Sequence, residues 1–192
     1  MNSEQDIVRS LISGESDAFD EMYTLYRDRI WRFLMRLTGN KTVAEDLFQE
    51  TWLAAASHAH LLREDTSLVR WLYTIARNAF RMSWRSHRAD LSKRAQLYLS
   101  SEEPRSMDDA LAARVDIAAA NDAMMRLPEA FCEVLVLCGC EGLSSEDAAA
   151  VLEISPEAVR KRLSRARAEL SALLEKKPAP KGLSPCVIRT SN

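Results

Sequence analysis

The sequence predicts an all-α protein made of two small helical domains joined by a flexible linker. Only 5 glycines and 6 prolines occur among the 192 residues, so few positions are expected to break a helix. Apolar residues recur at spacings of three and four, as on one face of an α-helix, and strand-like alternation is absent. The length suits one or two small domains better than one large core.

The first domain is expected to cover residues 1–90 and to contain three main helices. Apolar periodicity and capping signals place these helices over residues 18–37, from 42 to about 56, and from 68 onward. The predicted capping residues are Ser16-Asp17, Thr42 and Ser67. In the third helix, Trp71 and Phe80 share a stripe with Leu72 and Ile75, so we expect both aromatic rings to pack in the core.

A linker over residues 91–109 and a second helical domain over residues 110–175 are expected to follow. The linker is polar and contains turn residues. The predicted helices of the second domain lie over residues 110–126, 129–137, 145–152 and 156–174. Pro156 suits the first helical position, with Ser155 as its cap. Residues 176–192 contain three prolines and no helical period, so a disordered tail is expected.

The net charge of −2 does not by itself favour a nucleic-acid partner, but the charges are segregated. Residues 77–94 carry a net charge of +5 and residues 156–168 one of +4, whereas residues 45–50 and 100–116 are acidic. We interpret this as two basic faces and at least one acidic protein-binding face. Because the sequence has no long apolar run and no signal-peptide pattern, we expect a cytoplasmic protein without membrane insertion.

Residues 145–152, a short turn and residues 156–174 have the lengths of a helix-turn-helix, as in winged-helix-like domains. In the second helix, one stripe is apolar and consists of Val159, Leu163, Ala166 and Leu170. The opposite face would offer four residues to base edges in the major groove: Arg160, Lys161, Ser164 and Arg165. Arg162 and Arg167 flank them and would contact phosphates. A solvated basic helix is the alternative, and the short first helix, the turn and the Ser-Pro cap argue against it.

The turn of this motif has glutamate at a position where glycine is usual. Glycine adopts a left-handed backbone at little cost, whereas Glu153 does not. We therefore expect a slightly reshaped turn.

The four cysteines are Cys132, Cys138, Cys140 and Cys186. A disulfide framework is not expected in so helical a chain. The thiolates could instead hold a metal ion or form a redox pair, or the side chains could be small, partly buried apolar groups. Because Cys186 lies in the predicted tail and fits a dedicated metal site poorly, we expect no metal site and no cofactor.

Five short segments, in the same order along the chain, resemble the extracytoplasmic-function (ECF) sigma factors. These are the two-domain members of the sigma-70 family of bacterial RNA polymerase sigma factors. The segments are Asp46–Glu50, Trp71–Asn78, Leu127–Pro128, Glu141–Ser144 and Val159–Arg167. Each is weak alone, but all five in order are specific, and the likeness runs from about residue 7 to residue 174.

The resemblance implies a subunit without enzymatic activity that binds core RNA polymerase, recognises promoters and helps to melt them. It implies that Asp46, Gln49 and Glu50 bind the clamp helices of the β′ subunit, and that the β flap is a second contact. Alternatively, acidic residues could stabilise the positive end of the helix dipole. This would explain Glu45 and Asp46 at the helix N-terminus but not Gln49 and Glu50. An anti-sigma factor is a further expected partner, and a stress or envelope/metal response is the expected regulon.

The resemblance also implies how promoter DNA is divided between the domains. The loop over residues 61–67 and the helix after it would capture melted bases of the −10 element. The candidate residues for this are Arg63, Asn78, Arg81, Trp84 and Arg85. The exposed face of the 156–174 helix would read the −35 element as duplex.

One segment departs from the family pattern. Residues 137–140 read Leu-Cys-Gly-Cys, where the family usually has an apolar, a basic and an aromatic residue. We therefore expect the preceding helix to fray early, or Cys138 and Cys140 to have another role.

Two other classes of protein fit the sequence less well. A dimeric repressor or response-regulator output domain would share only the helix-turn-helix and would leave residues 46–50 and 71–78 unexplained. An enzyme is disfavoured because the chain has no glycine-rich phosphate loop and because the His58-x-His60 pair lacks nearby acids at metal-ligand spacing. The three histidines of the chain are His58, His60 and His87.

Overall fold

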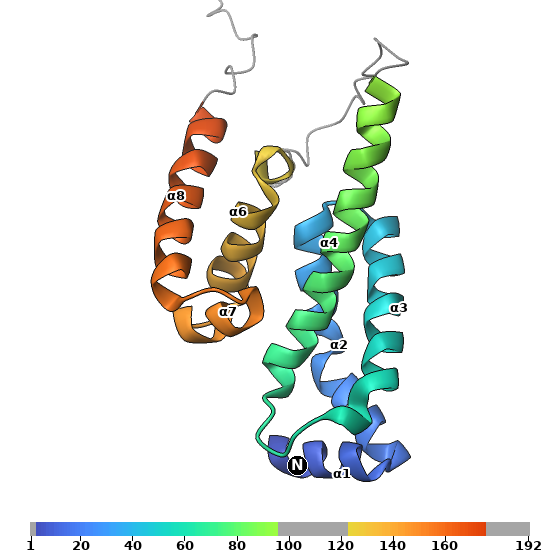
Figure 1. The fold of residues 1–192 in the computed structure, drawn as a ribbon. Helices are drawn as coiled ribbons and strands as arrows, with labels where there is room; N and C mark the ends of the chain where they lie inside the picture. Colours follow the sequence, from blue (N-terminus) through green and yellow to red (C-terminus); the bar gives the residue numbers. More distant parts are fainter. Residues whose placement is uncertain (1–2, 96–122, 176–192) are drawn as a thin grey trace, which may run out of the picture.

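The computed structural model describes residues 3–95 and 123–175, and for residues 85–95 it describes the backbone alone. Every regular element in these two ranges is helical, which confirms the predicted all-α class. Figure 1 shows two groups of helices packed side by side. We call them the N-terminal bundle (residues 3–95) and the C-terminal bundle (residues 123–175).

The N-terminal bundle consists of α1 (Glu4–Ser13), α2 (Ser16–Thr38), α3 (Lys41–His58), the 3-10 turn η1 (Ala59–Leu61) and α4 (Leu68–Ala95). In Figure 1, α2, α3 and α4 run alongside one another and α1 lies across their lower end. The predicted apolar stripes form the core, in which Phe33, Leu34 and Leu72 are fully buried. Between α2 and α3, the rings of Tyr23 and Trp52 meet edge to face at 4.7 Å.

The C-terminal bundle consists of α6 (Glu129–Val134), the π-helical turn η2 (Leu135–Cys140), α7 (Ser145–Leu152) and α8 (Pro156–Glu175). Residues 123–126 are also helical, and the predicted break at Leu127-Pro128 is present. The π-helix continues α6 through Cys140, so the helix does not fray early as expected. The core of the C-terminal bundle includes Val136, Val151 and Val159, all fully buried.

Helix α1 was not predicted, although its signals are present in the sequence. The Ser3 hydroxyl accepts a hydrogen bond from the Asp6 amide at 3.2 Å, and the Asp6 carboxylate accepts one from the Ser3 amide at 3.0 Å. This reciprocal pair satisfies two backbone groups that the first turn leaves unpaired. Gly14 ends the helix with a left-handed backbone, φ +80°.

Two predicted helix caps are wrong. Helix α2 begins at Ser16, and its N-cap is Glu15, which makes no side-chain capping bond. Helix α3 is capped by Asn40, whose side chain accepts from the Val43 amide at 3.2 Å, so the cap is not Thr42. The cap of α8 is confirmed, because the Ser155 hydroxyl accepts from the Ala158 amide at 3.1 Å.

Helix α4 continues to Ala95 and so passes the predicted domain boundary at residue 90. The rest of the expected linker, most of the expected 110–126 helix and the expected disordered tail over 176–192 lie outside the described residues.

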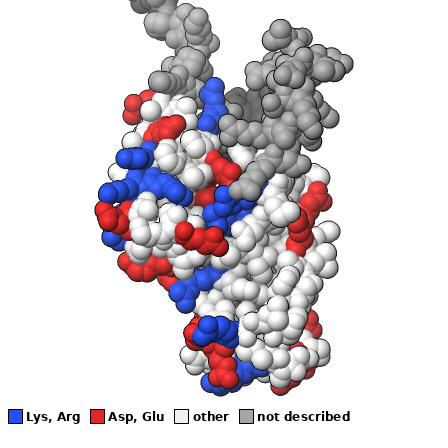
Figure 2. Space-filling model, in the orientation of Figure 1, with Lys and Arg blue, Asp and Glu red and all other residues white. Residues whose placement is uncertain are grey.

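The two bundles contact each other directly, chiefly through α4 and α7. At this contact Tyr73 and Arg77 of α4 are only 1% and 4% exposed. Figure 2 shows basic atoms bordered by acidic ones where the bundles meet, whereas much of the surface at the lower right is uncharged. The bundles therefore share a buried and charged interface.

Candidate nucleic-acid interface

The exposed ridge of α3 carries the residues expected to bind polymerase. Asp46, Gln49 and Glu50 are all exposed, and Leu53 on the same ridge is 70% exposed. The opposite side of α3 is anchored in the core by Leu47 and other buried residues. A large exposed leucine beside acidic groups is typical of a protein-binding surface.

A groove lies on each side of this ridge. Towards α2, a groove of about 280 Å³ is lined by Trp31, Phe48 and Gln49, among others. Towards α4, a hollow of about 460 Å³ is lined by Glu50. The three predicted residues thus lie on one ridge, but Gln49 and Glu50 border different grooves and Asp46 lines neither of these two. Trp31 was not predicted as part of this surface, although its position on α2 beside the apolar stripe could have indicated it.

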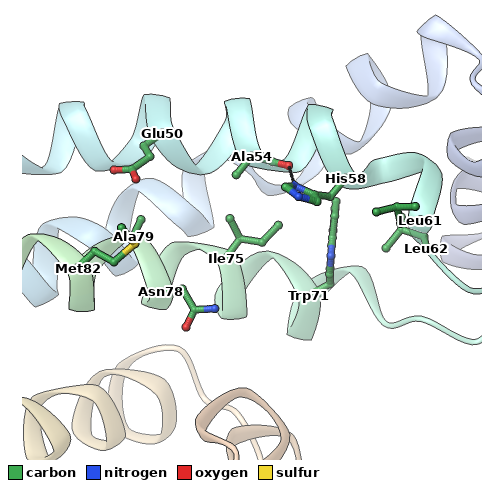
Figure 3. Close-up of a pocket in the computed structure, with 10 residues that line it drawn as sticks. All are labelled: Glu50, Ala54, His58, Leu61, Leu62, Trp71, Ile75, Asn78, Ala79 and Met82. Atoms are coloured by element: carbon green, nitrogen blue, oxygen red, sulfur yellow. Dashed lines mark hydrogen bonds between the residues drawn. The ribbon is translucent and has the colours of Figure 1, made fainter.

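The hollow between α3 and α4 is lined mainly by apolar side chains. Its walls are apolar side chains from both helices and from the loop between them, and its polar groups lie at the edge (Figure 3). Its lining residues are Glu50, Ala54, His58, Leu61, Leu62, Trp71, Ile75, Asn78, Ala79 and Met82. Nδ1 of His58 donates to the Ala54 carbonyl at 2.7 Å, which fixes the imidazole at the rim. An aromatic wall with a few polar edge groups suits a planar nucleobase.

Two aromatic residues of α4 were both expected in the core. Phe80 is 2% exposed, which confirms its assignment. Trp71 is half-buried, packs against the core on one side and lines the hollow on the other. The shared stripe indicated the buried side of Trp71 but could not indicate that a hollow lies beside it.

The loop that leads into α4 is held by short polar contacts. The Arg63 amide donates to the Thr66 hydroxyl at 3.1 Å, and the Thr66 amide donates to the Arg63 carbonyl at 2.9 Å. Glu4 of α1 accepts from the Leu68 amide at 2.6 Å, so a side chain from another helix caps α4. The Arg63 side chain is exposed, and its Nε lies 3.4 Å from an Asp65 carboxylate oxygen.

The five residues expected to bind the −10 element are not all on one open surface. Asn78 is exposed and borders the hollow. Arg81 is partly buried, and its Nε donates to Glu129 of α6 at 2.9 Å. Trp84 is partly buried, and its ring centroid lies 5.5 Å from that of Phe80; among the described residues its indole nitrogen has no hydrogen-bond partner. The side chain of Arg85 lies outside the described residues.

The predicted DNA-reading face of α8 is exposed throughout. Arg160, Lys161, Ser164 and Arg165 are all exposed, whereas Val159 on the opposite side is fully buried. Two of the cations already have acidic neighbours within the bundle. Lys161 Nζ lies 2.7 Å from Glu157, and Arg160 Nη1 lies 3.8 Å from Glu146. At these exposures such pairs contribute little stability and exchange readily for other anions.

The flanking residues differ in exposure. Arg167 is exposed, and Arg162 is partly buried. The rest of the apolar stripe follows the prediction, because Ala166 is fully buried and Leu163 and Leu170 are partly buried.

The turn between α7 and α8 is not reshaped around its glutamate. Glu153 itself adopts the left-handed conformation, with φ +57° and ψ +42°. Its amide donates to the Ala149 carbonyl, as in an ordinary left-handed helix end. The expectation of a reshaped turn is therefore wrong, and the strain is borne by the backbone of this residue.

The described cysteines differ in accessibility. Cys132 is buried, its thiol donates to the Met124 carbonyl at 2.9 Å, and burial together with the nearby Glu133 charge raises its pKa to about 12. Burial also raises the pKa of the partly buried Cys138, whereas Cys140 is exposed. Within residues 3–95 and 123–175, no three His, Cys, Asp or Glu side chains are grouped so that they could hold a metal ion. Cys186 lies outside the described residues, so a role for it stays a prediction.

No helix in the described parts of the chain is long and apolar enough to cross a membrane.

Comparison with known proteins places both bundles in one family. Residues 22–89 match the family described as Sigma-70 region 2, and residues 117–170 match Sigma-70, region 4. The ECF RNA polymerase sigma factor EcfG of Rhodopseudomonas palustris is 35% identical over 142 residues, which cover 74% of this chain and 77% of EcfG. The RNA polymerase sigma factor CnrH of Cupriavidus metallidurans is 30% identical, over 85% of this chain and 90% of CnrH.

Solved structures agree with these matches. CnrH in complex with the cytosolic domain of CnrY superposes with a TM-score of 0.71 and 27% identity, over 92% of this chain and 99% of CnrH. The sigma factor RpoE of Bartonella quintana, in complex with the anti-sigma factor NepR, gives a TM-score of 0.66 and 26% identity, over 83% and 98% of the two chains. This chain belongs to the ECF RNA polymerase sigma factors of the sigma-70 family, and its role is in transcription initiation.

Proposed function

We propose that this chain binds core RNA polymerase through the α3 ridge and directs it to promoters that it reads with both bundles. The observation that carries the proposal is the position of the α3–α4 hollow directly beside that ridge. Glu50 belongs to both, so polymerase bound to the ridge would lie next to DNA bound in the hollow. This proximity is what promoter melting on polymerase requires.

The hollow would receive a base of the −10 element after the strands separate. A flipped or unpaired base loses its stacking partners, and the Trp71 ring offers a replacement surface. Asn78 at the edge can both donate and accept hydrogen bonds, so it can recognise a base edge. Arg63 on the neighbouring loop would contact the phosphate backbone.

The exposed face of α8 would read the −35 element in the major groove. Arg160 and Arg165 can donate to guanine, and Ser164 between them allows the helix to approach the bases closely. The chain has a net charge of −2, so it lacks the excess of cations needed for strong binding to DNA by itself. Polymerase would therefore be required for stable promoter binding.

We also propose an anti-sigma factor as a partner and a stress or envelope/metal response as the regulon. RpoE of Bartonella quintana is bound to an anti-sigma factor in its solved structure, and this chain is 26% identical to it. Because core RNA polymerase is the proposed partner, we expect the protein in the cytoplasm. The β′ clamp helices are the proposed contact of the α3 ridge, and the β flap that of the C-terminal bundle.

The α3 ridge can be tested with the double variant Asp46→Ala/Glu50→Ala. Affinity for core polymerase should fall at least about tenfold, or ~1.4 kcal/mol, because two exposed charges are lost from the contact. Binding is measured by fluorescence anisotropy, and promoter-dependent run-off transcription is measured with the same samples. Asp20→Ala, which removes an exposed acid from α2, is the control and should behave like the unmodified chain.

The proposal would be overturned if the unmodified chain failed to direct core polymerase to any start site in a library of genomic promoters. Equal affinity of the double variant and the control would instead exclude the α3 ridge as the contact.

A further inference from the structure

Helix α1 makes a direct polar contact with the point at which the loop after α3 becomes α4. Oε1 of Glu4 accepts from the Leu68 amide at 2.6 Å and from the Ser67 hydroxyl at 3.5 Å. Leu68 is the first residue of α4, so its amide is one that the helix leaves without an internal partner. A carboxylate also suits the positive end of the helix dipole. Glu4 therefore holds the start of α4 through a charge-assisted hydrogen bond.

Glu4 itself lies on a fixed support. A capping box closes the first turn of α1, and Ile7 and Val8 bury the apolar side of this helix. Helix α1 packs against α2 and η1. Burial raises the pKa of Tyr26 on α2, and the nearby Glu4 charge raises it further. The Glu4 carboxylate thus lies where α1, α2 and the start of α4 meet.

A second contact between α1 and the loop is weak. Arg9 Nε lies 4.0 Å from a Glu64 carboxylate oxygen, and the two side chains are 57% and 77% exposed. Such a pair contributes little, because water and salt screen exposed charges. In Figure 1 the loop descends to α1 beside the end marked N. Among the described residues, Glu4 is therefore the principal polar link between α1 and this loop.

The junction that Glu4 holds lies between two walls of the α3–α4 hollow. Leu61 and Leu62 line the hollow from the chain before the junction, and Trp71 lines it from the first turn of α4 (Figure 3). The Trp71 amide donates to the Ser67 carbonyl at 3.0 Å in that same turn. The position of the Trp71 ring relative to the two leucines thus depends on how the chain turns at residues 67 and 68. Fraying of this turn would displace the aromatic wall of the hollow.

The contact can be removed without loss of the fold. Glu4 is an exposed residue, whereas α4 is anchored in the core by Leu68 and Leu72, both fully buried. The apolar side of α1 does not depend on the Glu4 carboxylate. The bond therefore acts on the conformation of the junction and not on the assembly of the bundle.

We propose that Glu4 is a positioning residue for the −10 element, and that it holds residues 61–68 and the first turn of α4 in the arrangement that receives an unpaired base. This inference rests on the proposed function of the hollow. Glu4 does not touch the base and acts through the Leu68 amide. Order that exists before binding lowers the entropy that base capture costs. The held junction therefore makes promoter opening more selective for the captured base.

Amide hydrogen exchange in the full chain, measured by NMR without polymerase, tests the restraint. In Glu4→Ala the Leu68 amide loses its acceptor and should exchange about tenfold faster, a loss typical of a missing helix cap. Glu4→Gln retains a side-chain oxygen with the same reach and should recover most of the protection. Glu4→Asp is one methylene shorter and should behave like the alanine variant.

Promoter opening with core polymerase tests the consequence. Opening rates are measured on templates that carry each of the four bases at each −10 position. In Glu4→Ala the preference for the captured base should fall about three- to tenfold at one position, and Glu4→Gln should stay close to the unmodified chain. Discrimination in the −35 element and affinity for core polymerase should not change. A general loss of stability would lower all of these together.

Two control variants accompany the test. Gln5→Ala changes the next residue of α1, which is exposed, and Asp20→Ala removes an exposed acid from α2. Both should leave the exchange of the Leu68 amide and the −10 preference unchanged. Urea denaturation checks that every variant is folded at the assay temperature.

Equal exchange of the Leu68 amide in Glu4→Ala and in the unmodified chain would overturn the restraint. Faster exchange with an unchanged −10 preference would overturn the positioning role and leave the proposed function intact. An equal loss of preference at the −10 and −35 elements would overturn it in the same way. If the unmodified chain starts transcription at no promoter, the proposed function fails and the positioning role falls with it.

Discussion

Arg81 and Arg165 show how the same residue type comes to differ in role. The sequence places both on basic helices and predicts DNA contacts for both. In the structure Arg165 is exposed, whereas Arg81 is partly buried and donates to Glu129. The partner of Arg81 lies 48 positions away in the chain, so no local pattern could indicate it. Side chains on the free face of a single helix were predictable, and side chains that meet another bundle were not.

At the residue scale, Arg165→Ala and Arg167→Ala should have different effects on the −35 element. Loss of a base contact at Arg165 should reduce discrimination at one base pair by about 1–3 kcal/mol. Loss of a phosphate contact at Arg167 should weaken binding to all sequences alike and lower the salt dependence of binding. Initiation rates on a set of single-base −35 variants, measured at two salt concentrations, would distinguish the two. A uniform loss for Arg165→Ala would reassign that residue to the backbone.

At the scale of single elements, apolar spacing predicted the positions of α2, α3, α7 and α8 well, but the ends less well. Helix ends depend on single side-chain bonds, such as Asn40 to the Val43 amide, and several nearby residues compete for each cap. Helix α1 has its own capping box but was missed, because its apolar stripe is short. The cap of α4 comes partly from Glu4 of α1, which only the folded bundle brings close.

The turn between α7 and α8 provides a test at this scale. Glu153→Gly should stabilise the chain by about 0.5–1 kcal/mol. The left-handed conformation costs a residue other than glycine about 1–2 kcal/mol, and glycine avoids this cost. Part of the stabilisation is lost because glycine has more conformational freedom in the unfolded chain. Gly142→Ala is the matched control with the opposite sign, since Gly142 also has positive φ, +71°. Urea denaturation measures both. Destabilisation by Glu153→Gly would show that the glutamate side chain makes a contribution larger than the strain.

At the scale of the whole molecule, the structure joins two bundles that the sequence predicts as separate units. The buried Arg77–Glu133 pair and the Tyr73–Glu141 bond make the stability of each bundle depend on the other. Removal of one partner from a buried ion pair is strongly destabilising, because the other charge stays unpaired away from water. We therefore expect the bundles to unfold together.

Calorimetry tests this coupling. The unmodified chain should show one transition with equal calorimetric and van't Hoff enthalpies. In the Glu133→Gln variant the single transition should broaden or separate into two, because the bundles then unfold separately. Asp20→Asn should retain the single transition. Two resolved transitions in the unmodified chain would contradict a tight interface.

The sequence by itself determined the helical class, the two helical units, the α3 ridge and the exposed face of α8. These depend on periodicity along one helix, which is a local property that side chains three and four positions apart express directly. Only the tertiary structure decided the hollow between α3 and α4, the cap that Glu4 supplies to α4, and the pairing of Arg77 and Arg81 with α6. Each of these joins groups far apart in the chain, and their meeting depends on how the helices pack.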